Sequence, residues 1–322
     1  MLVVSRGALL ATTASLAAGL LTGPGVAYAA DTSTPLSAAE MAADLTAVST
    51  ASAQAAAGGW KATVKMTGDS LSGSEFAAAD PVAGVAVDRY VFGGLVSTRY
   101  SVVGKGSYFS LVDPGSLAAV KMMRRPSVRY VFEADKSNTD LGDGMSPGTL
   151  LTGDVYHAGT KTVHDDGSAD YRLSRDGTTT TAHVTAAGTL ASADSDEDGF
   201  HAKLAYAYGP QHVTPPSASV TIGADALDVG LAYLEMATSV KQVAGAAATD
   251  ALEAAGGHKI SMSSLWKATQ QDVQAFNDDT IRMIKAKRVG GGVRVYATNP
   301  WTHRTVAYTL TPSGRRVTIA KS

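Results

Sequence analysis

Hydrophobic and polar residues alternate along much of the chain. The clearest run spans residues 60–67, where Trp60, Val64 and Met66 fall on one side and lysines and threonines on the other. Alternation with a period of two is typical of an antiparallel strand that buries one face. Similar signals predict strands at residues 87–92, 98–103, 107–112 and 127–133, and a meander of strands between residues 150 and 222.

Two helix starts interrupt these strands in the first half of the chain. Ser37 and Glu40 have the spacing of a capping box, which predicts a helix from there to about residue 57. Asp113 followed by Pro114 predicts the start of a short helix, because aspartate is a good N-cap and proline suits the first helical position.

The last third of the chain combines helices with short strands. An apolar stripe predicts a long helix over residues 225–255, and a shorter helix is expected near residues 264–276. Turns that contain glycine and proline then separate three predicted strands, with a fourth after the last turn. These strands cover residues 281–289, 293–298, 304–311 and 316–319.

The N-terminus has the pattern of a secretory signal peptide. Arg6 precedes an apolar run, and Ala27 and Ala29 supply the small residues that signal peptidase needs. The run is shorter than the roughly 20 residues that cross a bilayer. We therefore expect cleavage near Ala29 and a secreted, extracytoplasmic mature protein. The expected division of the chain is a signal peptide (1–29), a sheet domain (30–224), a connecting helix (225–257) and a small basic helix-plus-β module (258–322).

The chain contains no cysteine. This excludes disulfides, thiolate metal sites and cysteine nucleophiles. It also removes the residue to which bacterial lipoproteins attach lipid, so we expect a released protein. Stability must then come from the hydrophobic core, which a chain of this length can make large.

Charge is distributed unevenly along the sequence. The chain has 29 acidic and 27 basic residues, yet residues 280–322 contain no aspartate or glutamate. An acidic body with a basic C-terminal module is suited to binding anionic cell-wall polymer or lipid headgroups, or to docking of the module on the body. Nucleic acid is not expected, because no nucleic-acid motif is present. The candidate anion-binding residues are Lys285, Lys287, Arg288, Arg294, Arg304, Arg315 and Arg316.

No catalytic pattern meets its structural requirement. Gly144, Ser146 and Gly148 match the G-x-S-x-G motif, but that motif needs a strand before the serine and a helix after it. Here the preceding glycines and Pro147 predict a turn. The histidines show no H-E-x-x-H spacing. We therefore expect a protein that is not an enzyme and needs no cofactor.

One acidic segment resembles the start of a calcium loop. Asp194, Asp196 and Asp198 stand at alternate positions before Gly199, but Ala205 occupies the place of the bidentate glutamate of an EF-hand. The segment is either a weak calcium site in a hairpin loop or an acidic, solvated hairpin tip.

The order of these elements resembles the LolA/LppX superfamily of extracytoplasmic lipid carriers. The matching features lie within residues 37–222: the first helix, the strand GWKATVKM at residues 59–66, the helix entry VDPGSL at 112–117, and the strands at 170–173 and 201–209 that lead to Pro215 and Pro216. The chain departs from the pattern in having no anchoring cysteine and in the residues after Asp225. The resemblance implies an α+β fold with a curved antiparallel sheet, an open half-barrel, under a helical lid.

The same resemblance implies an apolar cavity between sheet and lid. Its ligand contacts would come from Trp60, Val64, Met66, Tyr100 and Phe109 of the sheet and from Leu117, Met122 and Met123 of the lid. The alternative is that these residues form the core of an ordinary packed sheet.

The expected function is non-catalytic binding or transport of a hydrophobic or amphipathic ligand, a lipid or lipopeptide, in the bacterial envelope or medium. The alternative is a secreted adhesive or structural protein that binds anionic cell-wall polymer through its basic C-terminal module.

Overall fold

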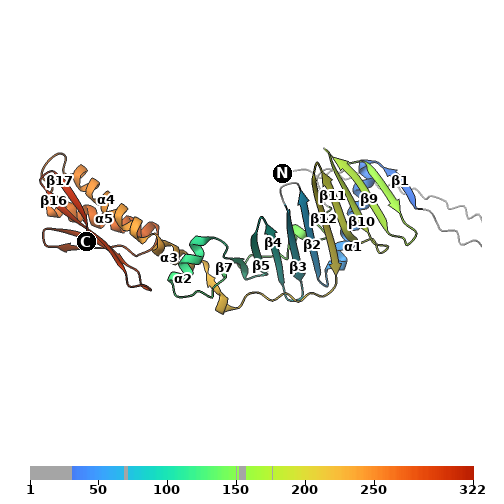
Figure 1. Cartoon of the computed structure of the whole chain (residues 1–322), viewed down its shortest axis with the longest axis horizontal. Coiled ribbons are helices and arrows are strands. Elements are labelled where there is room, and N and C mark those ends of the chain that lie inside the picture. Colours follow the sequence, from blue (N-terminus) through green and yellow to red (C-terminus); the bar gives the residue numbers. More distant parts are fainter. Residues whose placement is uncertain (1–30, 69–71, 150, 152–156, 176) are drawn as a thin grey trace, which may run out of the picture.

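The computed structural model describes residues 31–322 except 69–71, 150, 152–156 and 176. The predicted signal peptide lies outside the described residues. A large curved sheet lies at one end of an elongated molecule and a smaller helix-and-sheet unit at the other (Figure 1). The expected α+β class, with a curved, unclosed sheet and a separate antiparallel sheet, is confirmed.

Thirteen strands form the large sheet in the order β1-β8-β9-β10-β11-β12-β2-β3-β4-β5-β6-β7-β13. Each neighbouring pair is antiparallel except β7 and β13, which are parallel. The strands are β1 (Thr32–Leu36), β2 (Trp60–Gly68), β3 (Ser72–Asp80), β4 (Val85–Phe92), β5 (Leu95–Val102), β6 (Gly106–Ser110), β7 (Tyr130–Ala134), β8 (Gly159–Val163), β9 (Ala169–Arg175), β10 (Thr178–Val184), β11 (Leu190–Glu197), β12 (Phe200–Tyr208) and β13 (Thr221–Gly223).

Helix α1 (Ala38–Ala56) lies on one face of this sheet, which we call the inner face. The predicted capping box is present, because the Ser37 hydroxyl accepts from the Glu40 amide and the Glu40 carboxylate accepts from the Ser37 amide. Met41 and Leu45 of α1 are buried against residues of β9–β11, including Leu190. The helix therefore covers one half of the inner face and supplies its core.

Helices α2 (Pro114–Met122) and α3 (Ala224–Leu234) pack against each other beside β7 and β13. Asp113 caps α2 as predicted, accepting from the Ser116 amide at 2.7 Å. Val120, Ile222 and Leu227 belong to the cluster that these helices bury. The helix expected as a lid lies at the β7 end of the sheet, where it packs on α3 (Figure 1).

The C-terminal unit packs α4 (Met236–Ala254) and α5 (Met262–Asp279) against a four-stranded antiparallel sheet. Its strands are β14 (Lys285–Val289), β15 (Gly292–Thr298), β16 (Thr305–Ser313) and β17 (Arg316–Lys321). The helix predicted for residues 225–255 is divided into α3 and α4, because Glu235 leaves helical geometry at φ −85° and ψ 4°. Among the described residues, no helix is both long enough and apolar enough to cross a membrane.

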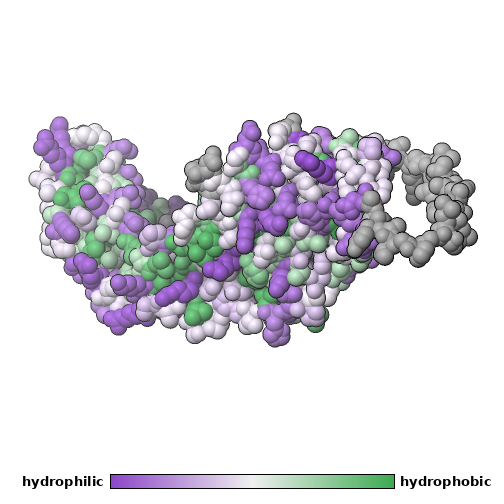
Figure 2. Space-filling view, turned by 45° about the vertical axis from the view of Figure 1, so that its right-hand side comes forward, coloured by the Kyte–Doolittle hydropathy of each residue, from purple (hydrophilic) through white to green (hydrophobic). Residues whose placement is uncertain are grey.

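Trp301 connects this unit to the α2–α3 cluster. Its ring lies 5.4 Å from that of Tyr233 in an edge-on arrangement, and it packs on the cluster around Ile222. The Asn299 side-chain amide also lies 3.0 Å from the Met122 sulfur. Apolar surface gathers between the large sheet and the C-terminal unit, whereas the surface over the sheet is mostly hydrophilic in this view (Figure 2).

Candidate functional site

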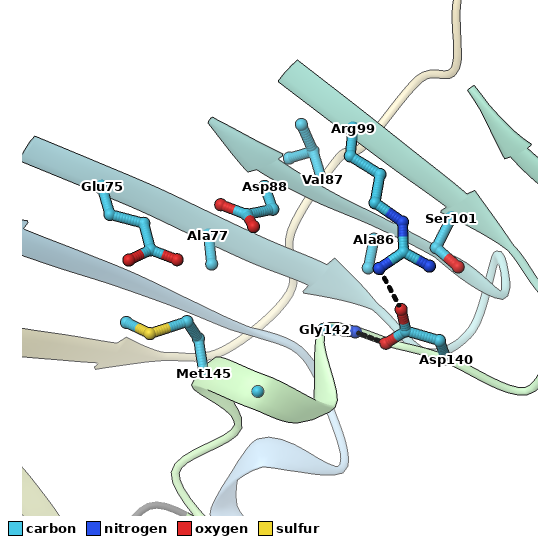
Figure 3. Close-up of a pocket in the computed structure, with 11 residues that line it drawn as sticks. Glu75, Ala77, Ala86, Val87, Asp88, Arg99, Ser101, Asp140, Gly142 and Met145 are labelled. Carbon is cyan, nitrogen blue, oxygen red and sulfur yellow. Dashed lines mark hydrogen bonds and ion pairs between the residues drawn. The ribbon is translucent and has the colours of Figure 1, made fainter. Parts of the chain in front are cut away.

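A pocket of about 350 Å³ opens on the inner face beside β3, β4 and β5 (Figure 3). The strands form its floor, and the segment after β7 forms its lip. Its lining residues are Glu75, Ala77, Ala86, Val87, Asp88, Arg99, Ser101, Asp140, Gly142, Gly144 and Met145.

Strand register brings the floor residues together. Ala77 is paired with Asp88, and Asp88 is paired with Arg99, across three neighbouring strands. Paired residues of an antiparallel sheet share a face. Ala77 and Ala86 are almost fully buried. Because their side chains are single methyl groups, they leave space between the strands and the lip.

The lip is fixed by hydrogen bonds and one ion pair. Asp140 accepts from the Gly142 amide at 2.8 Å and pairs with the Arg99 guanidinium at 3.0 Å. The Tyr206 hydroxyl donates to the Met145 carbonyl at 2.9 Å. Burial raises the pKa of Tyr206, so this hydroxyl keeps its proton and remains a donor. The lip is therefore anchored to both β5 and β12.

Gly142 allows the lip to lie directly on the core. Its φ is +80°, in the left-handed region that glycine adopts readily, and a Cβ there would lie 3.2 Å from the Trp60 ring. Ser146 follows η1 (Asp143–Met145), a single 3₁₀ turn in this lip, so the strand–serine–helix elbow is not formed there.

Three carboxyl groups and one guanidinium line the pocket. Burial raises the pKa of Glu75, and the neighbouring Asp88 raises it further. The pKa of Asp88 is also raised, again mainly by burial, although Glu75 and Arg99 oppose the shift.

Two polar atoms of this group have no hydrogen-bond partner. Asp88 Oδ1 and Arg99 Nε are both buried and unpaired among the described residues. Buried polar atoms in folded proteins are normally paired, because leaving one unpaired costs about 1–3 kcal/mol.

The structure divides the predicted cavity residues among different places. Trp60 and Val64 belong to one inner-face cluster, and Trp60 is only 3% exposed because the lip covers it. Met66 and Phe109 lie on the same face of the sheet as these two residues. The Arg99 guanidinium lies over the Phe109 ring, 5.6 Å from its centroid. Tyr100 occupies the opposite, outer face.

The three predicted lid residues lie elsewhere. Met122 and Met123 pack within the α2–α3 cluster, and Leu117 on the same helix is 38% exposed. They do not line the pocket. Glu75, Asp88 and Arg99 were not predicted. A signal exists for Asp88, because the alternation in residues 85–92 places it on the same side as Ala86.

The predicted calcium residues lie mainly in a strand. Asp194 and Asp196 belong to β11, and Asp198 follows in the turn before β12. Asp194 pairs with His183 at 2.9 Å, and Asp196 pairs with His201 at 2.7 Å. Within the described part of the chain, no three histidine, aspartate or glutamate residues are grouped as metal ligands.

These pairs are part of a row of alternating aspartate and histidine on the outer face. His164 lies 3.1 Å from Asp31 and 3.3 Å from Asp170, and His183 lies 2.7 Å from Asp170. The hydrogen bonds that the His164 ring donates to Asp31 and, secondly, to Asp170 raise the pKa of His164. The row joins β8 to β12 along the side opposite α1.

The predicted anion-binding residues are spread over the C-terminal unit. Lys285, Lys287 and Arg294 share the side of the sheet away from α4 and α5, because the alternate residues Val293 and Val295 are buried against the helices. Arg288 points the other way, over the Trp266 ring at 5.3 Å. Arg304 and Arg315 lie in turns and Arg316 begins β17.

Comparisons with known proteins give a weak likeness of fold. No family model matches the sequence, and no curated protein matches it. Among solved structures, LprF from Mycobacterium bovis is 14% identical with a TM-score of 0.29, covering 56% of this chain and 98% of its own. An uncharacterized conserved protein from Thermus thermophilus is 12% identical with a TM-score of 0.26, covering 55% and 96% respectively.

A DUF1329 family protein from Desulfovibrio piger is 9% identical with a TM-score of 0.23, covering 55% of this chain and 95% of its own. The likeness thus covers little more than half of this chain. The resemblance to the LolA/LppX superfamily over residues 37–222 remains a weak one, of fold alone.

Proposed function

We propose that the protein is a non-catalytic, extracytoplasmic carrier that binds an amphipathic small molecule at the inner face of its large sheet. One observation carries this proposal: the pocket between β3–β5 and the lip is lined both by apolar side chains and by charged groups. Binding pockets commonly combine apolar lining with a few fixed polar groups.

This mixed lining suits the two parts of an amphipathic molecule. Apolar contact would come from Ala77, Ala86 and Met145. Polar contact would come from Glu75, on the same strand as Ala77, and from Asp88, on the same strand as Ala86 (Figure 3). Each methylene that leaves water contributes about 0.8 kcal/mol. The alkyl part would supply affinity, and the polar part would fix orientation.

Native mass spectrometry of the protein secreted by its own host tests this proposal. We expect a bound mass that is released on denaturation and identified as an amphiphile. In Ala77→Met the longer side chain occupies the floor of the pocket, so the bound mass should disappear. Ala78→Met is the matched control: it is the next residue of β3, is also buried, and faces the other way.

The circular dichroism of both variants establishes that they fold. Protein that carries no ligand from its host, and that binds neither dodecanol, dodecylamine nor dodecanoate when these are added, would refute the carrier function.

A second function is favoured by the exposed side of the C-terminal sheet. Lys285, Lys287 and Arg294 gather there around Tyr296, whose ring lies 5.6 Å from the Lys287 ammonium and 5.8 Å from the Arg294 guanidinium. Adhesion to anionic cell-wall polymer would use this surface. Pull-down on purified wall should then decrease with salt and in Lys285→Glu/Lys287→Glu, and equal retention of the variant would exclude it.

A further inference from the structure

The hairpin formed by β4 and β5 ends in a tip that is both apolar and exposed. Gly93 and Gly94 form its turn, and both have a positive φ, of 54° and 83°, as a two-residue hairpin turn requires. Leu95 is 50% exposed and Val96 is 42% exposed, and among the described residues they are the only two consecutive large hydrophobic residues that are exposed. Single exposed apolar residues are ordinary, whereas a contiguous group marks an interaction site.

The tip is apolar on both faces of the sheet. Phe92 is paired with Leu95, and Val91 with Val96. Because paired residues share a face and successive residues alternate, the first pair lies on the inner face and the second on the outer face. All four side chains are at least partly exposed. A folded partner that packs on one face would leave the other pair in water, whereas a lipid layer surrounds both faces.

Polarity increases stepwise along β4 with distance from the turn. After the two apolar pairs come Tyr90, whose ring stacks on that of Phe92 at 5.8 Å, and then Arg89, which is exposed. At about 3.3 Å per residue, Arg89 lies about 10 Å along the strand from Phe92. A membrane interface has the same order over this depth: acyl chains, then the level where tyrosine rings gather, then phosphate groups. The Arg89 guanidinium is complementary in charge to those phosphates.

We propose that the β4–β5 tip binds the protein to the surface of a lipid bilayer, with Phe92, Leu95 and the two valines among the acyl chains and Arg89 at the phosphates. This proposal goes beyond the carrier function and does not depend on it. Penetration is shallow, because a peptide group in hydrocarbon needs an internal partner and the two glycines of the turn lie outside the paired register of the strands. We expect a depth of about 5–10 Å.

Flotation of the secreted protein with lipid vesicles tests this proposal. The vesicles consist of phosphatidylcholine alone or of an equal mixture of phosphatidylcholine and phosphatidylglycerol. We expect binding to both, and at least about fivefold tighter binding to the mixture, which corresponds to about 1 kcal/mol for one arginine at an anionic surface. Arg89→Gln should reduce this preference and leave binding to phosphatidylcholine unchanged. Leu95→Ser/Val96→Ser should weaken binding to both kinds of vesicle at least about tenfold.

Val103→Ser/Leu117→Ser is the matched control. It also removes one valine and one leucine from the surface, with exposed fractions of 40% and 38%. Val103 follows the opposite end of β5, and Leu117 lies on α2. This variant should bind vesicles like the wild-type chain, and circular dichroism establishes that both double variants fold.

A single fluorescent label measures the depth of insertion directly. Because the chain contains no cysteine, Leu95→Cys and Val103→Cys can each be labelled at one position with a dye whose emission depends on polarity. Vesicles should shift the emission of the label at position 95 to shorter wavelength, and lipids with a quencher on the acyl chain should quench it. The label at position 103 should change little. This measurement keeps the test decisive if the double variant at the tip does not fold.

Three results would overturn the proposal and leave the carrier function in place. The first is unchanged vesicle binding by Leu95→Ser/Val96→Ser, or an equal response of the two labels. The second is binding to the phosphatidylglycerol mixture alone that salt abolishes and the tip variant retains, which would assign membrane contact to the basic C-terminal sheet. The third is self-association of the wild-type chain, lost in the tip variant, without vesicle binding, which would make the tip an interface between two copies.

Discussion

Asp272 should make the stability of the C-terminal unit depend on pH. It lies on α5 close enough to Asp250 of α4 for that carboxyl group to act on it, and its Oδ2 is buried without a hydrogen-bond partner among the described residues. Burial, and secondly Asp250, raises the pKa of Asp272 from 3.8 to about 6. In the folded chain Asp272 therefore binds a proton more strongly than in the unfolded chain.

The direction and size of the effect follow from this difference. The contribution of Asp272 to the free energy of unfolding is fully present below the pKa that this residue has in the unfolded chain. It is lost as the pH rises through the pKa that the residue has in the folded chain. A shift of about two units corresponds to about 3 kcal/mol at 1.36 kcal/mol per unit. Asp250 is exposed and Asp272 only partly buried, so solvent screening reduces the expected loss to about 1 kcal/mol.

The perturbation is Asp272→Asn, which keeps an amide donor toward Asp250 at every pH. Compared with the wild-type chain, it should be about 1 kcal/mol more stable at about pH 7.5 and nearly equal at about pH 4. Hydrogen exchange of α4 and α5 peptides measures this locally, with an expected slowing of about fivefold at the higher pH.

Asp279→Asn is the matched control, because it removes an exposed carboxylate from the same helix. It should leave exchange unchanged at both pH values. The reasoning fails if Asp272→Asn accelerates exchange at the higher pH, or if its effect is the same at both pH values.

Two further predictions concern the large sheet. Gly142→Ala should lower the melting temperature, since it forces alanine to φ +80° beside Trp60 at a cost of about 1–2 kcal/mol. Gly144→Ala, where a methyl group has open space, should leave the melting temperature unchanged; equal melting curves for the two variants would contradict this. Titration of the His164 ring by nuclear magnetic resonance should give a pKa above its ordinary value of 6.5, and Asp170→Asn should lower it; an unchanged midpoint in that variant would show that the row of charges does not act on His164.

Local signals in the sequence predicted the helices and strands that depend on nearby residues. The capping pair at Ser37, the N-cap at Asp113 and the alternation after Trp60 each produced the expected element. The four C-terminal strands were also predicted, because turns with glycine mark their ends.

Strand β3 was missed because its residues are small and polar rather than β-branched. Ala77, Ala78 and Ala79 give no alternating signal, although all three are buried by neighbouring strands. The break at Glu235 was missed for a different reason. The chain turns there so that the alanines of α4 pack on α5, and that contact is not local in sequence.

The pocket could be predicted only in part. Alternation places Asp88 on the inner face, but its proximity to Glu75, Arg99 and Asp140 depends on strand order and on the path of the lip. The resemblance to lipid carriers favoured an apolar cavity. The structure instead has a pocket whose lining is partly charged, because three carboxyl groups and a guanidinium meet there.

The open sheet also has two edges that are poor templates for another strand. At one edge, Pro35 lies inside β1 and has no amide hydrogen to donate to an incoming chain. At the other edge, β13 is only three residues long and α3 follows it immediately. Edge strands that are short or contain proline resist edge-to-edge association. The unclosed sheet can therefore remain free of edge-to-edge association at high protein concentration.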